Sequence, residues 1–209
     1  MRVVPAPRVC SADAQKKCRL LPKGTKVRLS RGVNSIKTTV AGTLIYGVQL
    51  DSTNTTLAAG TYNFTGVGGP DVGPFTASYT FPTPFSWTNQ SSLATIVRAN
   101  GATINWTGGD PAGYVTIAGD STLAGATAAT TATVSFTCTA RVTDGTFTGP
   151  PVVLLALPPT AAAPGATFAT PGTLSVTHIG TTVTQIKATG IEIGGIGSVF
   201  AFGTSATYQ

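Results

Sequence analysis

The chain has 209 residues, only 10% of them charged, and its longest apolar run, 152–157, is too short for a membrane-spanning helix, which needs about 20 residues. Residues 1–40 hold ten Lys or Arg and one acid (10 − 1 = +9), whereas residues 41–209 hold three basic and six acidic residues (3 − 6 = −3). The net charge of +6 therefore belongs to one end of the chain, which excludes a basic body of the kind that binds polyanions.

Residues 1–38 form a basic leader that we expect to be irregular, although Lys26–Ser30 alternates as a short strand does. The leader lacks the aromatic residues that stack on bases, so nucleic acid is not an expected partner. A signal peptide requires an apolar stretch of about 7–15 residues. The start of the leader has no such stretch, because it is interrupted by Pro5, Pro7 and Arg8. We therefore expect a truncated sequence or a mis-assigned start.

The cysteines are Cys10, Cys18 and Cys138, an odd number without the C-x-x-C spacing of zinc or redox sites. In an exported chain, Cys10 and Cys18 could close a short loop, and the sequence leaves this open. Cys138 is expected to be a small apolar side chain on a strand.

From Thr39 onward, strand patterns become regular. A first, partial β unit is predicted over 39–92, with strands at 39–50, 61–65 and 75–81. The polar run 88–92 is the predicted boundary of this unit.

A second β unit is predicted over 93–209. Its short strands alternate with turns rich in Gly, Pro and Asp, which is typical of a sandwich or barrel. The Asn100-Gly101 pair is the strongest hairpin signal, and Gly119-Asp120 is a further predicted turn. The predicted strands are 95–98, 102–106, 113–118, 132–140, 145–148, 152–157, 172–177, 183–189 and 197–203. The fold class is thus all-β, with two packed β units and an Ig-like β-sandwich as the C-terminal one.

Several motifs carry a resemblance to known proteins. They lie at 59–64, 68–75, 87–90, 97–101, 104–111, 136–140, 145–148, 153–158 and 207–209. Together they are similar to the C-terminal β region of a large uncharacterised family of exported soil-bacterial proteins. The resemblance covers roughly residues 55–209 and leaves out the basic leader. It implies export, β architecture and a missing upstream portion, but no mechanism.

Candidate catalytic groups are few. His178 is the only histidine, and Gly197-Ser198-Val199 lacks the second Gly of a nucleophile elbow. Most of the acids adjoin Gly or Pro, where Asp serves turns, and Glu192 lies between two isoleucines as the outward residue of a strand does. We therefore assign no catalytic residue, no metal ligand and no cofactor, and we expect a protein that is not an enzyme.

Trp87 and Trp106 are possible carbohydrate contacts, because exposed aromatic rings stack on sugars, although most aromatics in alternating strands face a core. Asn54, Asn63, Asn89 and Asn105 lie in N-x-S/T motifs and mark expected surface positions.

These observations predict a non-catalytic extracellular or cell-surface module, structural or adhesive, with an unknown ligand. Thr makes up 35 of the 169 residues from 41 onward, and such a Thr-rich surface of low charge suits contacts with envelope or matrix components or with polysaccharide. A carbohydrate-binding module with exposed aromatics is the first alternative. An extracellular hydrolase is the second.

Overall fold

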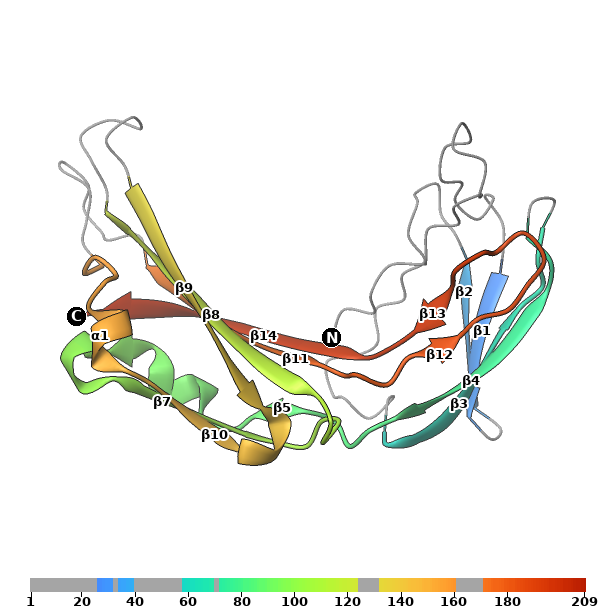
Figure 1. Ribbon diagram of the computed structural model, residues 1–209, viewed down its shortest axis with the longest axis horizontal. Helices are drawn as coiled ribbons and strands as arrows, with labels where there is room; N and C mark the ends of the chain where they lie inside the picture. The colour runs from blue at the N-terminus through green and yellow to red at the C-terminus, as the bar shows by residue number, and fades with distance from the viewer. Residues whose placement is uncertain (1–25, 32–33, 40–57, 70–71, 124–131, 161–170) are drawn as a thin grey trace. The chain divides into compact units, whose positions relative to one another are not determined.

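The computed structural model describes residues 26–31, 34–39, 58–69, 72–123, 132–160 and 171–209 (Figure 1). The chain divides into two compact units. Unit 1 comprises Met1–Pro84 and Gly180–Val199, and unit 2 comprises Phe85–Ile179 and Phe200–Gln209. This division differs from the expected domains 39–92 and 93–209 at two places, because residues 180–199 belong to unit 1 and residues 85–92 belong to unit 2.

Unit 1 is built on one antiparallel sheet. Its strands are β1 (Lys26–Arg31), β2 (Asn34–Thr39), β3 (Gly60–Gly66) and β4 (Phe75–Phe81), in the order β2-β1-β3-β4. The expectation of an irregular leader over 1–38 is therefore wrong for 26–31 and 34–38, which lie in β1 and β2. The alternation at Lys26–Ser30 indicated β1, and the hydrogen-bonded neighbours on both sides of β1 stabilise it as a strand. Most of the strand predicted at 39–50 lies outside the described residues.

Strand β4 shows how alternation builds a small core in unit 1. Phe75, Ala77 and Tyr79 are buried while the residues between them are exposed. Phe75 and Ala77 pack with Ile186, which lies just after β12 (Thr184–Gln185). β12 pairs with β13 (Gly195–Ile196), and the strand predicted at 183–189 is thus limited to two residues.

Unit 2 contains two sheets. The smaller has the order β10-β7-β5, formed by β10 (Thr146–Gly149), β7 (Ala102–Thr107) and β5 (Ser86–Trp87). The larger has the order β6-β14-β11-β8-β9. Its strands are β6 (Thr95–Ile96), β14 (Val199–Tyr208), β11 (Gly172–Ile179), β8 (Tyr114–Leu123) and β9 (Ala132–Arg141). The expected turn at 119–120 is wrong, because β8 runs straight through it as the partner of two strands.

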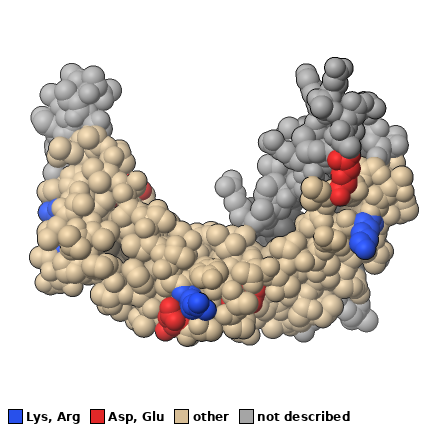
Figure 2. Space-filling view, in the orientation of Figure 1, with Lys and Arg blue, Asp and Glu red and all other residues tan. Residues whose placement is uncertain are grey.

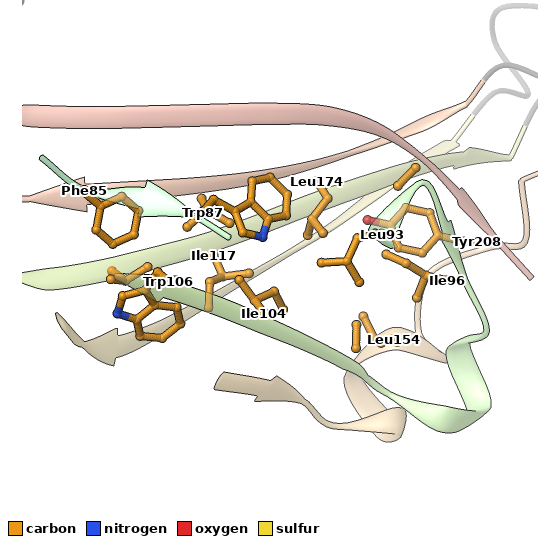
Figure 3. Close-up of a cluster of buried hydrophobic side chains, with 14 of the residues drawn as sticks. Phe85, Trp87, Leu93, Ile96, Ile104, Trp106, Ile117, Leu154, Leu174 and Tyr208 are labelled. Atoms are coloured by element: carbon orange, nitrogen blue, oxygen red, sulfur yellow. The ribbon is translucent and has the colours of Figure 1, made fainter. Parts of the chain in front are cut away.

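One hydrophobic core lies between these two sheets (Figure 3). The smaller sheet contributes Ile104, and the larger contributes Ile117 and Leu174, each at most 1% exposed. Both sheets supply inward residues to the same cluster, so unit 2 is a sandwich of two packed sheets.

The apolar run predicted as a strand at 152–157 is instead a short helix, α1 (Pro151–Leu154), followed by a turn. Pro151 occupies the first helical turn, where its missing N–H has no cost. Leu154 and Leu157 are each 1% exposed, whereas Val152 and Leu155 are exposed. The buried residues of this segment are thus three positions apart, as on one side of a helical turn. In the sequence, an unbroken run of apolar residues is compatible with a strand as well as with a helix.

Gly101 does not form the hairpin that its sequence signal favours. It follows a 3-10 turn, Arg98–Asn100, and connects β6 to β7, which belong to different sheets. Its φ of +77° and ψ of −178° lie in a region open essentially to Gly alone, and a Cβ there would come within 2.8 Å of the Gly149 carbonyl oxygen.

Gly101→Ala is accordingly expected to lower the free energy of unfolding by roughly 1–3 kcal/mol, the usual cost of such backbone strain. Gly203→Ala is the matched control, because a Cβ at Gly203 meets nothing within 4 Å. Urea unfolding of both variants gives the comparison. Equal stability of the two would contradict the strain at Gly101.

Candidate functional site

His178 is the one imidazole of the chain, and it lies on the inward face of β11 with none of its surface exposed. The backbone N–H of Asp110 donates to its Nε2 at 3.0 Å. Its Nδ1 is buried and has no hydrogen-bond partner. Because Nε2 accepts, the ring is neutral and carries its proton on Nδ1.

Two aromatic rings border His178. Phe85 stacks on it, with ring centroids 5.3 Å apart and planes 22° apart, and Phe200 lies 5.7 Å away in a tilted arrangement. Gly109 and Gly113 approach so closely that a Cβ on either would meet the imidazole. Burial lowers the pKa of His178, and the nearby Asp110 opposes this shift only in part.

This arrangement makes His178 a structural group. A general base needs its acceptor nitrogen within reach of a substrate proton. Here the acceptor is occupied by the Asp110 amide, and aromatic rings flank the imidazole. Ser198, the serine of the Gly197-Ser198-Val199 sequence, lies in unit 1. Its hydroxyl oxygen accepts a hydrogen bond from the Tyr79 hydroxyl at 2.9 Å.

The carboxylates also have local structural partners. Asp110 Oδ1 accepts from the Ala112 N–H, and Asp144 Oδ2 accepts from the Arg141 N–H at a 3-10 turn. Thr173 donates its hydroxyl to Asp120, while Glu192 is exposed in unit 1. Within the described ranges, no three His, Cys, Asp or Glu side chains are grouped to hold a metal ion.

Tyr208, the last residue of β14, belongs to the hydrophobic core of unit 2. Its ring is fully buried and its hydroxyl donates to the Thr173 carbonyl at 2.7 Å. Burial, with a smaller contribution from the charge of Asp120, raises the pKa of Tyr208 to about 12.

Burial likewise raises the pKa of the half-buried Cys138 thiol, which disfavours the thiolate. Cys10 and Cys18 lie outside the described residues.

Trp87 and Trp106 lie opposite one another on β5 and β7, and both are in the core (Figure 3). They are 4% and 3% exposed, so neither indole presents a face on which a sugar could stack. The N–H of Trp87 donates to Asn89 Oδ1 at 3.1 Å, and that of Trp106 donates to the Val142 carbonyl at 2.8 Å.

Asn89 is a structural residue that the sequence interpretation missed. Its Oδ1 accepts from the Trp87 indole and from the Asn105 N–H, and its Nδ2 donates to the Thr103 carbonyl at 2.8 Å. The side chain therefore connects the end of β5 to β7. The N-x-S/T motif at Asn89 predicted only a surface position, so the sequence did not indicate this role.

Comparisons of the sequence with protein-family models, with curated proteins and with solved structures find no match. No helix among the described residues is long and apolar enough to span a membrane.

The buried neutral His178 predicts a loss of stability on acidification. Its folded pKa lies below the ordinary value of 6.5, so below about pH 6.5 the unfolded chain takes up a proton that the folded chain excludes. Stability is therefore full above that pH and falls as the pH drops through it. Urea midpoints at pH 7.5 and 5.5 should show the decrease.

His178→Gln is the control for this titration, because Gln keeps an acceptor near Nε2 and does not titrate. Its midpoint should change much less over the same interval. An equal change in both proteins would assign the effect to other groups.

The two indoles give a second prediction. Trp106→Phe leaves the buried Val142 carbonyl with only the longer hydrogen bond from the Gly145 N–H, at 3.3 Å, and should cost about 1–3 kcal/mol beyond the loss of ring volume. Trp87→Phe should cost less, because Asn89 Oδ1 keeps the shorter hydrogen bond from the Asn105 N–H, at 2.9 Å. Denaturant unfolding compares the variants, and a larger loss for Trp87→Phe would contradict the assignment.

Proposed function

We propose that this chain is a non-catalytic extracellular structural or adhesive β module, related to the exported soil-bacterial proteins that its motifs resemble. The observation that carries the proposal is a set of hydroxyl-bearing rows on the outward face of the five-stranded sheet. The opposite face of that sheet belongs to the core, with Val115, Ile117 and Val176 fully buried.

The rows follow from strand register. Thr116 lies between Thr177 of β11 and Thr139 of β9, and Ala118 lies between Ser175 and Thr137. The next row contains Thr173, Asp120 and Ser135. Neighbouring strands are about 4.8 Å apart and alternate residues about 6.7 Å apart, so the hydroxyls form a regular two-dimensional array.

Charge is scarce around these rows. The five strands of the sheet contain two charged residues, Asp120 and Arg141. Acidic and basic side chains are also few among the described residues in the view of Figure 2. Such a surface favours hydroxyl-rich, uncharged partners, such as the polysaccharides of an envelope or matrix, over polyanions. Individual hydroxyl contacts contribute about 1 kcal/mol each, so binding requires many of them at once.

We also infer an Ig-like arrangement for unit 2. β5, β7 and β10 pair as strands A, B and E do, and β14, β11, β8 and β9 pair as G, F, C and C′ do. β6 runs parallel to β14 at the edge of the larger sheet. The disulfide typical of antibody domains has no counterpart, since neither β7 nor β11 contains a cysteine.

The two alternatives have weaker support. A carbohydrate-binding module with exposed aromatics does not fit the burial of Trp87 and Trp106. A hydrolase would need titratable groups that converge on accessible space, whereas His178 is buried and its acceptor nitrogen is occupied.

Co-sedimentation with insoluble polysaccharides and with cell-wall sacculi tests the proposal. The Thr116→Val/Thr177→Val variant keeps the branched shape but removes two opposed hydroxyls, and at about 1 kcal/mol each its affinity should fall roughly 30-fold. Thr103→Val/Thr148→Val is the matched control, since these hydroxyls bond across the smaller sheet. Absence of binding, or equal binding by both variants, would overturn the proposal. Release of reducing ends would favour the hydrolase.

A further inference from the structure

Strand β9 (Ala132–Arg141) is the edge of the five-stranded sheet. Among the described strands it has one neighbour, β8, with which it pairs along all ten residues. In an antiparallel pair, every second residue of an edge strand directs its backbone N–H and C=O away from its neighbour. β9 therefore carries a row of backbone donors and acceptors that fits an added extended strand.

The edge lacks the devices that usually prevent strand addition. Residues 132–140 contain no Pro and no charged residue, and the first charge is Arg141 at the end. The opposite edge of this sheet, β6, is only two residues long. β6 pairs only with Thr207 and Tyr208 of β14, which is also uncharged. β9 is the long, uncharged strand at the other edge of the sheet, and a strand can be added along its whole length.

The inward side of β9 is incompletely covered. Phe136, Cys138 and Ala140 pack against the core yet remain only partly buried. The opposing sheet has three strands and the sheet that contains β9 has five. A strand added to β9 would continue the apolar layer and remove more of these three side chains from water.

The outward side of β9 carries Thr133, Ser135, Thr137 and Thr139, all exposed. Facing threonines already bond through their hydroxyls in three strand pairs, at Thr61–Thr80, Thr103–Thr148 and Thr122–Thr133. A partner strand that presents Thr or Ser opposite β9 would repeat this chemistry, and β9 itself is such a strand.

We propose that β9 is a strand-addition site whose occupant is β9 of a second copy of this chain. The two strands would pair antiparallel about a two-fold axis and join the two sheets into one. Residues on the same face must lie opposite each other, which places the axis at a single residue in the middle of the strand, at 136, 137 or 138. Each of these registers separates the two Arg141 side chains to opposite ends, so no like charges meet.

Sedimentation equilibrium of the full chain over a range of concentrations tests the assembly. The wild-type chain should form a reversible dimer. Thr137→Lys should weaken it at least tenfold, because two ammonium groups would then lie close to one another near the axis. Ser205→Lys is the matched control: Ser205 is exposed on β14, which β11 and β8 separate from β9 in the same sheet, and the change should leave the dimer unchanged.

A monomer at all concentrations, or equal weakening by both lysine variants, would overturn the proposal. Circular dichroism of each variant shows whether the monomer remains folded. Concentration-independent protection of all β9 amides from hydrogen exchange would mean that another part of the same chain covers the edge, and would overturn it as well.

Disulfide trapping then identifies the register. With Cys10 and Cys18 replaced by Ser, oxidation should link Cys138 to its copy if the axis passes through residue 138, since facing Cα atoms about 4.5–5.5 Å apart suit a disulfide. Single cysteines at Phe136 or Thr137, with Cys138→Ser, report the other two registers. One of the three positions should link strongly and Ser205→Cys should not. Equally weak linking at all positions would contradict a defined pairing.

Discussion

The register of β8 is the constraint on which unit 2 depends. This strand lies between β11 and β9, and its inward residues Val115 and Ile117 are completely buried. A slip of one residue would move both to the solvent face and bring Thr116 into the core. The burial of two aliphatic side chains therefore also fixes the positions of the outward hydroxyls. The core and the hydroxyl array are two results of one alternation.

A second consequence concerns the polar groups that the core encloses. Buried donors in unit 2 are satisfied by particular partners, such as the Val142 carbonyl for the Trp106 indole and Asn89 for Trp87. His178 Nδ1 is an exception, since no partner faces it. An unpaired buried N–H is costly, so the close packing around His178 must offset this cost. That packing includes Gly109 and Gly113, whose missing side chains give the ring its space.

The sequence was sufficient to predict an all-β chain. The alternation of apolar and polar residues and the turn residues between the strands are local signals, and in most strands the tertiary pairing agrees with them. The sequence failed where the outcome depended on distant partners. The alternation at Lys26–Ser30 was too short to predict the sheet in which β2 and β3 lie beside β1, and the run after Pro151 became a helix because the core accepts Leu154 and Leu157. Asp110 and Asp144 were predicted as turn residues and lie at turns, whereas Asp120 lies within β8 and Glu192 lies outside the strands.

The candidate site was harder to predict for the same reason. Whether an aromatic residue stacks on a ligand or fills a core depends on the sheet that faces it, so Trp87 and Trp106 were ambiguous until their burial was known. The structural use of Asn89 was hidden because its three partners lie on segments brought together only by the pairing of β5 and β7.

The insertion of residues 180–199 between β11 and β14 has a consequence for biosynthesis. This segment belongs to unit 1, where Ile186 packs with Phe75 and Ala77, although it is translated after nearly all of unit 2. On the ribosome the N-terminal sheet must therefore wait for residues more than a hundred positions downstream before its small core is complete. Nor can a protease or a gene fusion separate the two units with a single cut, because the chain passes between them three times.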